Sequence, residues 1–220
     1  MKPWAARVVD FLVPFGMLIR EAEHRPLFDR WPEIIWRFLP HTFFVFWLFS
    51  YVPLIGSFIY MLVLVPLSAW RYQTERGTAL EKQEMAATLL LYFTVILIGF
   101  GSVWAFVGHF FLADQIARGI GWETGSPFQT ELAFYTLGTG VAALLAVWLR
   151  GHLITAVVIS KSIFWYGAAY VHIHDAIVNA NYAPLNIGRP LIGDIIYPTL
   201  LLALLAISWK APGEPRPEQA

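Results

Sequence analysis

Long apolar runs alternate with short polar stretches along most of the chain. A helix needs about 20 apolar residues to cross a bilayer, and four runs approach or exceed that length: residues 86–113, 127–149, 153–178 and 190–209. The second and third runs are separated only by Arg150, Gly151 and His152, so the helices on either side must be antiparallel neighbours. The pattern therefore predicts an all-α, polytopic membrane protein with an antiparallel four-helix transmembrane bundle over residues 86–209.

The region before this core is less regular. Residues 1–37 mix basic and aromatic side chains, which is typical of a segment at the membrane interface. Residues 38–70 are apolar but are interrupted at Pro53 and Gly56, so they form either one kinked span or a short hairpin of two helices. We favour the hairpin, because it keeps the basic N-terminus on the same side as the basic loop predicted at residues 71–85.

The distribution of basic residues predicts the orientation. Cytoplasmic segments of membrane proteins carry an excess of Lys and Arg. With alternating spans, one side of the bundle receives Arg71, Arg76, Lys82, Arg150, Lys210 and Arg216, and the other only Arg118 and Arg189. We therefore expect a multi-pass membrane protein with both termini in the cytoplasm. Residues 114–125 are expected to be a short loop on the other side, and the Pro- and Glu-rich tail 210–220 is expected to be disordered.

Composition supports this class and excludes others. Of the 220 residues, 58% are hydrophobic and only 14% are charged, whereas soluble domains carry about 25% charged residues. The formal net charge is zero, which gives no support for nucleic-acid binding. There is no cysteine, so disulfides and thiolate chemistry are excluded. The sequence contains no nucleotide-binding loop, Ser-His-Asp elbow or zinc-protease motif. The absence of these motifs favours a protein without enzymatic activity.

Small residues recur within the apolar runs. In lipid, helices associate where small side chains let their backbones approach closely. The glycines of the Gly138-Thr139-Gly140 segment are interpreted as packing residues and not as a phosphate-binding loop. Further expected packing positions are Gly99, Gly101, Ser102, Ala142, Ala146, Gly167 and Ala168.

Imidazoles and carboxylates gather at one end of the four predicted helices. His109 lies near the end of the first helix, Glu131 at the start of the second, His172 and Asp175 near the end of the third, and Asp194 at the start of the fourth. Because the helices alternate in direction, we expect these five side chains to meet in one layer on the non-cytoplasmic side. Glu131 also lies where the positive end of a helix macrodipole stabilises a carboxylate.

One charge lies deeper in the predicted membrane. Lys161 precedes His172 by eleven residues, which places it about 16 Å further along the same helical stripe, near the bilayer midplane. A lysine at that depth is costly and normally faces the protein interior or water. It is either a functional charge or a structural one, paired with a backbone carbonyl or with a hydroxyl such as that of Ser102 or Thr139.

Three interpretations of the polar layer remain open. Imidazole and carboxylate ligands suit transition metals, with Glu131, His172 and Asp175 as the main candidates and Asp194 or His109 as alternatives to Asp175. His109 and His172 could instead hold a haem from two sides. The third interpretation is a polar network that fixes the helices, because buried polar groups must find partners in lipid.

Three groups of residues resemble those of a family of small, uncharacterised bacterial membrane proteins. They comprise Glu131, Leu132, Phe134, Leu137 and Gly138, then Gly167, Ala168, Ala169, His172 and Ile173, then Asn181, Tyr182, Ala183, Pro184, Asn186 and Gly188 followed by Asp194 and Pro198. The resemblance covers roughly residues 86–208. It implies a four-helix core in the bacterial cytoplasmic (inner) membrane and no particular activity, and residues 1–70 lie outside it.

The sequence thus leaves three functions to compare. The first is a non-catalytic subunit or assembly partner of a larger membrane complex, embedded in lipid and bound to another membrane protein or to its own copies. The second is a metal- or haem-binding redox protein that uses the polar layer. The third is a small proton-coupled transporter that uses Lys161 and Glu131.

Overall fold

The computed structural model describes residues 65–75 and 82–209, together with the isolated residues 5 and 63. Every regular element in this part of the chain is helical, which confirms the all-α prediction for the residues described. The helices are α5 (Val65–Glu75), α6 (Lys82–Phe93), η2 (Thr94–Phe100), α7 (Gly101–Phe111), α8 (Ala113–Ile120), α9 (Phe128–Leu145), α10 (His152–Val178) and α11 (Arg189–Ser208).

A continuous helical rod runs through the centre of the molecule. It comprises α6, η2 and α7 and spans the 30 residues Lys82–Phe111. Its middle segment, η2, is a π-helix of seven residues, a wider coil that is usually short and often marks a functional site. The first half of the rod packs against α5 and α11, and the second half packs against α9.

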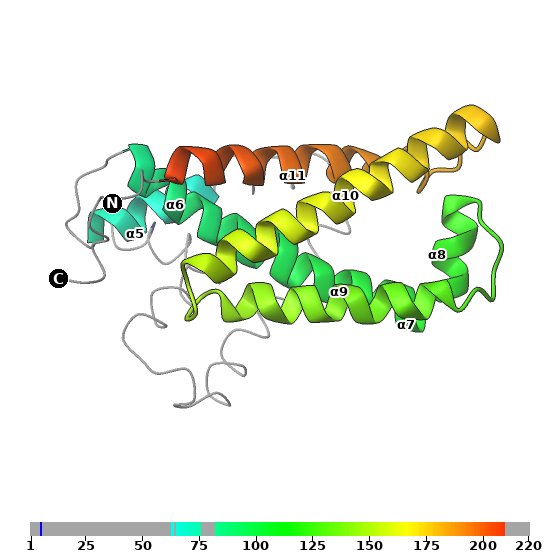
Figure 1. Ribbon diagram of the computed structural model, residues 1–220, viewed down its shortest axis with the longest axis horizontal. Coiled ribbons are helices and arrows are strands. Elements are labelled where there is room, and N and C mark those ends of the chain that lie inside the picture. Colours follow the sequence, from blue (N-terminus) through cyan, green and yellow to red (C-terminus); the bar gives the residue numbers. More distant parts are fainter. Residues whose placement is uncertain (1–4, 6–62, 64, 76–81, 210–220) are drawn as a thin grey trace.

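The rod and the three helices α9, α10 and α11 run in alternating directions along the long axis of the molecule, and α8 lies across one end (Figure 1). Three helices are long and apolar enough to cross a membrane, namely the rod, α10 and α11. The 18 residues of α9 are not among them, and the first turns of α9 contain Gln129, Thr130 and Glu131. The prediction of four membrane spans therefore stays a prediction.

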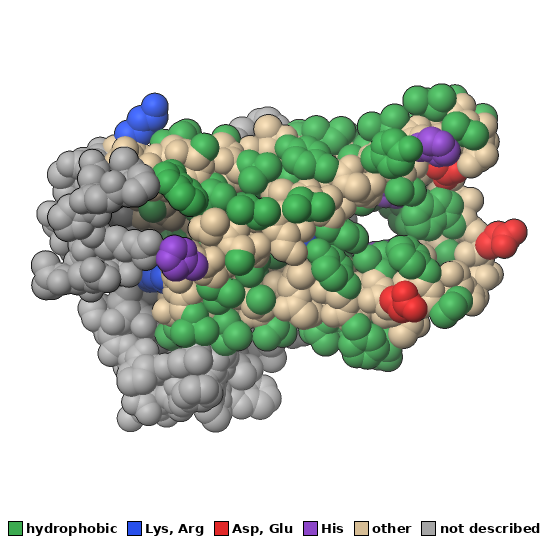
Figure 2. Space-filling model, in the orientation of Figure 1, with side chains coloured by type: hydrophobic (Ala, Val, Ile, Leu, Met, Phe, Trp, Pro, Cys, Tyr) green, Lys and Arg blue, Asp and Glu red, His purple; other side chains and the backbone are tan. Residues whose placement is uncertain are grey.

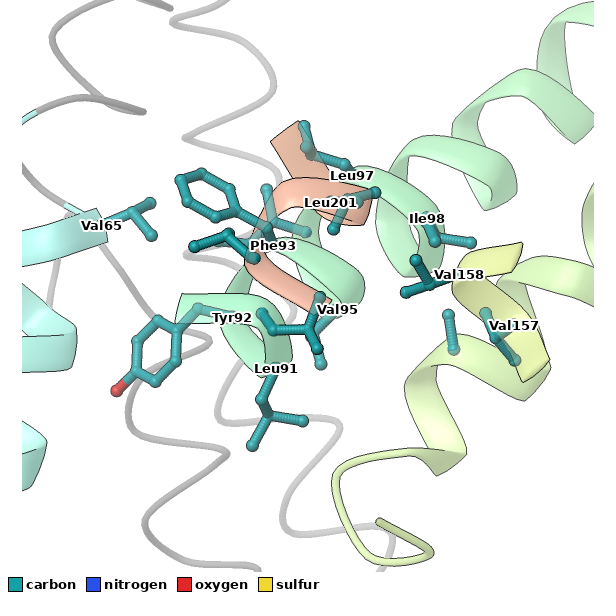
Figure 3. Packing of buried hydrophobic residues seen from close by; sticks show 14 of the residues in the cluster. Val65, Leu91, Tyr92, Phe93, Val95, Leu97, Ile98, Val157, Val158 and Leu201 are labelled. Atoms are coloured by element: carbon teal, nitrogen blue, oxygen red, sulfur yellow. The ribbon is translucent and has the colours of Figure 1, made fainter. Parts of the chain in front are cut away.

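The apolar core lies where the first half of the rod meets its neighbours. Figure 3 shows Phe93 and Leu97 of the rod close to Leu201 of α11, and Ile98 close to Val158 of α10. These buried side chains fix the relative positions of three helices. Much of the remaining apolar surface is exposed: only 17% of the most apolar stretch of α11 is covered by the protein itself.

Two glycines set the distance between the rod and α9. A Cβ atom on Gly140 would lie 3.0 Å from the carbonyl oxygen of Gly99 and 3.2 Å from the backbone nitrogen of Val103. A Cβ on Gly99 would lie 2.9 Å from Leu144. The two helices thus pack backbone to backbone at this crossing, as small residues allow in membrane proteins. In contrast, Gly138 and Gly167 have no neighbour within 4 Å of an added Cβ, so they are not packing residues.

Two predicted loops are shorter than expected. The predicted loop 71–85 loses its first five residues to α5 and its last four to α6. The predicted loop 114–125 contains most of α8, whose end is fixed by Gly121 in the left-handed conformation (φ 84°). The predictions for residues 1–37, most of 38–70 and 210–220 lie outside the described residues.

Candidate functional site

The side chains of His172 and Asp194 join α10 to α11 inside the protein. The Nε2 atom of His172 lies 3.9 Å from Oδ2 of Asp194. Both side chains are largely buried, with 9% and 14% of their surface exposed. These two residues of the predicted polar layer thus lie close together, because antiparallel helices place the end of one beside the start of the next.

A buried asparagine contacts the other ring nitrogen of His172. The Nδ1 atom of His172 lies 2.7 Å from Oδ1 of Asn186. The amide nitrogen of Asn186 donates to the carbonyl oxygens of His172 (3.3 Å) and Asn181 (2.7 Å). Asn186 is completely buried, so this loop residue positions His172. It was part of the family resemblance but was not predicted as a site residue.

Asp175 binds a separate group of residues. Its Oδ2 atom accepts hydrogen bonds from the indole nitrogen of Trp122 (3.0 Å) and from Nδ2 of Asn181 (2.6 Å), and its Oδ1 atom accepts one from Asn179 (2.7 Å). The Trp122 ring also stacks on the His172 ring, with centroids 5.9 Å apart and planes at 13°. Asp175 thus ties the end of α10 to the segment that follows α8.

The loop after α10 adds to this connection. Nδ2 of Asn181 also donates to the carbonyl oxygen of Ile120 (2.8 Å), and the backbone nitrogen of Leu185 donates to that of Gly119 (3.0 Å). We call Trp122, Asp175, Asn181 and these backbone contacts the α8 clasp. It closes the end of the molecule that lies beyond His172.

Lys161 is almost completely buried, with 2% of its surface exposed. Its Nζ atom lies over three aromatic rings, 4.6 Å from the centroid of Phe164, 5.3 Å from Tyr135 and 5.4 Å from Trp165. We call these rings the aromatic box. Asp194 interacts with Lys161 electrostatically, but within residues 65–75 and 82–209 no direct ion pair or hydrogen bond reaches the ammonium group.

His109 lies on the rod, at the edge of this site. Its Nδ1 atom lies 2.6 Å from Oε1 of the buried Gln129 at the start of α9. It also interacts electrostatically with Lys161. The direct partner of His109 is thus an amide and not a carboxylate, and its place in the polar layer stays a prediction.

Glu131 lies apart from the other residues of the predicted polar layer. Its side chain is exposed, and among the described residues no hydrogen bond or ion pair connects it to His109, His172 or Asp194. No three His, Asp or Glu side chains in this part of the chain are grouped so that they could hold a metal ion. The expected ligand set of Glu131, His172 and Asp175 is therefore not assembled, because Glu131 faces outward and Asp175 is occupied by three donors. The haem alternative remains untested.

The space between the helices is not completely filled. Figure 2 shows an opening between α10 and α9, on the side towards α8. It lies where α10 leaves α9, since α10 packs mainly along α11 and α9 packs mainly along the rod. We call Lys161, His172 and Asp194 the buried triad. Lys161 and His172 lie on α10, which borders the opening, and Asp194 lies on α11, which packs along α10.

Together these features define a class: an all-helical protein with membrane-compatible helices and a polar site between them. The chain belongs to DUF6790, a family of unknown function, whose model matches residues 52–214. The match extends the predicted range of 86–208 upstream, into the region of the predicted hairpin. No curated protein and no solved structure matches the chain.

Proposed function

We propose that this protein carries out proton-linked transport of a small solute, with the buried triad as the site of binding and proton exchange. The observation that carries the proposal is the burial of Lys161 among aromatic rings, 2% exposed, in a helix apolar enough to cross a membrane. Ionisable residues in such positions are expensive and usually mark ion or substrate pathways.

The connections of Lys161 support this interpretation. A purely structural lysine in lipid would be expected to bind backbone carbonyls or hydroxyls directly. Instead, Lys161 faces the aromatic box, and Asp194 directs its carboxylate towards His172. The triad therefore contains two basic groups and one acid that can exchange protons without large rearrangement of the helices.

Two interruptions in the spans also favour transport. Transporters often contain helices that are broken near the binding site. The central rod contains the π-helical segment η2, and α11 contains Pro198, four residues after Asp194. Proline removes a backbone donor within a helix and weakens it locally. The site thus lies beside segments whose backbone is less regular than that of an uninterrupted helix.

Replacing Lys161 with Met should abolish proton-linked solute movement. The protein would be reconstituted in liposomes that contain a pH-sensitive dye, and gradients of amino acids, monocarboxylates and monovalent cations would be imposed one class at a time. With the wild-type protein we expect one class to change the internal pH faster than in protein-free liposomes. Lys161→Met removes the buried charge and should reduce the rate to the protein-free level.

Glu131→Gln provides the matched control, because Glu131 is exposed and lies outside the triad. It should keep at least about half of the wild-type rate, as expected for a surface substitution. Circular dichroism would show whether each variant is folded. If no solute class moves protons, or if Lys161→Met simply fails to fold, transport through this residue is contradicted.

A second function, as a subunit of a membrane complex or a homo-oligomer, is favoured by an exposed aromatic surface. Phe106, Phe110 and Phe111 of α7 and Phe134 of α9 pack together, with centroid distances of 4.9 to 6.0 Å. Phe111 and Phe134 are 65% and 55% exposed. Rigid aromatic groups of this kind are enriched at the centres of protein interfaces.

A photoreactive phenylalanine analogue at position 111 should form one discrete protein adduct in native membranes if this surface is an interface. The same analogue at Ile163, which is 69% exposed on α10, serves as the control and should label mainly lipid. An adduct with a second copy would identify a homo-oligomer, and an adduct with another membrane protein would identify a complex. Lipid labelling at both positions would contradict the interface.

We place the protein in the bacterial cytoplasmic membrane because of its resemblance to bacterial membrane proteins, and the charge pattern favours both termini on the cytoplasmic side. In this orientation the turn at Arg150 and Gly151 faces the cytoplasm, and the α8 clasp faces the other side. The solute would then enter from the non-cytoplasmic side past the clasp.

A further inference from the structure

We infer that the aromatic box around Lys161 binds a small organic monoanion, such as an aromatic carboxylate, and that His172 takes up a proton when the anion binds. This inference rests on the proposed transport function and names the class of solute. It is argued from the hydrogen-bonding capacity of Lys161, from the walls of the box and from the charge balance of the triad.

The ammonium group of Lys161 has three N–H donors, and in the described part of the chain none of them has a hydrogen-bond acceptor. Cation–π contacts stabilise the positive charge, but they do not satisfy these donors. Since the side chain is 2% exposed, bulk water satisfies them poorly. A carboxylate oxygen would supply a charged acceptor at this position, which makes the strongest type of hydrogen bond.

The walls of the site suit an apolar body attached to that anion. Tyr135 of α9 packs on Phe164 of α10, with ring centroids 4.9 Å apart, and Trp165 packs edge-on against Tyr197 of α11 at 5.9 Å. The box itself is therefore built by α9 and α10, and Tyr197 of α11 packs against its Trp165 ring. Ligand sites typically combine such apolar and aromatic surfaces with a few convergent polar groups. A flat aromatic ring would fit against these surfaces better than a strongly hydrated inorganic anion.

The charge balance of the triad explains why a proton is taken up together with the anion. With His172 neutral, the positive charge of Lys161 is balanced by Asp194, and an additional anion would be uncompensated in a nearly dry site. When His172 is protonated, it forms an ion pair with Asp194, whose carboxylate lies 3.9 Å away. Lys161 is then free to balance the bound anion. Anion and proton thus stabilise each other, and the loaded site is neutral overall.

Other ionisable groups around the triad leave this balance unchanged. From the rod, His109 faces Lys161 and is bound to Gln129. On its own helix His172 is near Asp175, which already accepts three hydrogen bonds. The remaining ionisable groups are Tyr135 on α9 and, on α11, Tyr197 with the neighbouring Arg189.

Benzoate binding to the purified protein in lipid nanodiscs would test the inference. Titration calorimetry should show saturable binding by the wild type, with uptake of about one proton when two buffers of different ionisation enthalpy are compared. Because one proton binds with each anion, the affinity should fall by up to about tenfold for each unit by which the pH is raised. His172→Gln can still bind Asn186 but cannot titrate, so its benzoate affinity should lose most of this pH dependence.

Two further variants separate the anion site from the fold. Lys161→Met should weaken benzoate binding at least about tenfold, because it removes the only buried cation of the box. Tyr135→Leu keeps the charge but removes one wall, and should weaken benzoate more than acetate. His174→Ala, on the exposed face of α10, should bind like the wild type.

The outcomes distinguish this inference from the transport proposal. Absence of benzoate and acetate binding to folded wild-type protein would overturn the inference, while proton-linked flux driven by another solute class would leave transport intact. Binding without proton uptake would overturn the role of His172. Benzoate binding with proton uptake, but without flux in liposomes, would support the site and contradict transport.

Discussion

Substituting Gly140 with Leu is expected to cost more than about 3 kcal/mol of stability. The added Cβ alone would lie 3.0 Å from the carbonyl oxygen of Gly99 and 3.2 Å from the backbone nitrogen of Val103. Both neighbours are backbone atoms of the rod, so they cannot rotate away as a side chain could. The rod and α9 would have to separate, and both helices would lose their packing. Thermal unfolding in detergent micelles, followed by circular dichroism, would measure the loss.

Gly138→Leu is the matched control on the same helix. Gly138 is exposed, and no atom lies within 4 Å of an added Cβ. Leucine is also a better helix former than glycine by up to about 1 kcal/mol. This variant should therefore be as stable as the wild type or slightly more stable. Equal destabilisation by the two substitutions would show that glycine flexibility matters here, and not the close approach of the helices.

The second large effect is expected for Asn186→Leu. This change removes a completely buried amide and leaves the Nδ1 atom of His172 and the carbonyl oxygen of Asn181 without their partners. Each unsatisfied buried group costs about 1–3 kcal/mol, so a loss on the order of 3 kcal/mol is expected. The imidazole would also lose its orientation towards Asp194. The midpoint of thermal unfolding would fall, and proton-linked flux should fall with it.

Asn179→Leu tests whether burial is the cause. Asn179 also donates one hydrogen bond, to Oδ1 of Asp175 (2.7 Å), but its side chain is exposed. Water can replace a lost partner at such a position, so the change in stability should stay within about 0.5 kcal/mol. A loss as large as that of Asn186→Leu would mean that the loop, and not the buried amide, carries the stability.

The helices were predictable because apolar length and periodicity are local properties. The ends of α10 and α11 agree with the sequence prediction to within one residue. The π-helical turn at Thr94–Phe100 could not be predicted, because it depends on how the two halves of the rod pack against different neighbours. Similarly, composition identified glycines but could not show that Gly140 lies at a helix crossing and Gly138 does not.

The site was predictable only in part. Alternating helix direction explains why His172 and Asp194 lie close together, and the spacing of Lys161 explains why it shares the buried face of α10 with His172. The rotation of α9 was not predictable from the sequence, because apolar residues lie on every side of α9 and define no single inward face: Phe134 and Val141 are exposed, whereas Ala133 and Ala143 are buried. Glu131 was therefore expected inside but is exposed. The roles of Trp122 and Asn186 depend on loop conformation, for which no periodic signal exists.

The weak contact between α9 and α10 has a mechanical consequence. The two helices are joined at Arg150 and Gly151, where Gly151 adopts a positive φ of 69°, and each then packs along a different partner. A change of conformation at this turn would rotate α10 relative to α9. Because α10 is about 40 Å long, a rotation of about 5° moves its far end by about 3.5 Å. At that far end, the α8 clasp connects α10 and the loop after it to α8 and the segment before α9. It does so through the hydrogen bonds Trp122–Asp175 (3.0 Å), Asn181–Ile120 (2.8 Å) and Leu185–Gly119 (3.0 Å). All three bonds would have to break before the two helices could swing apart.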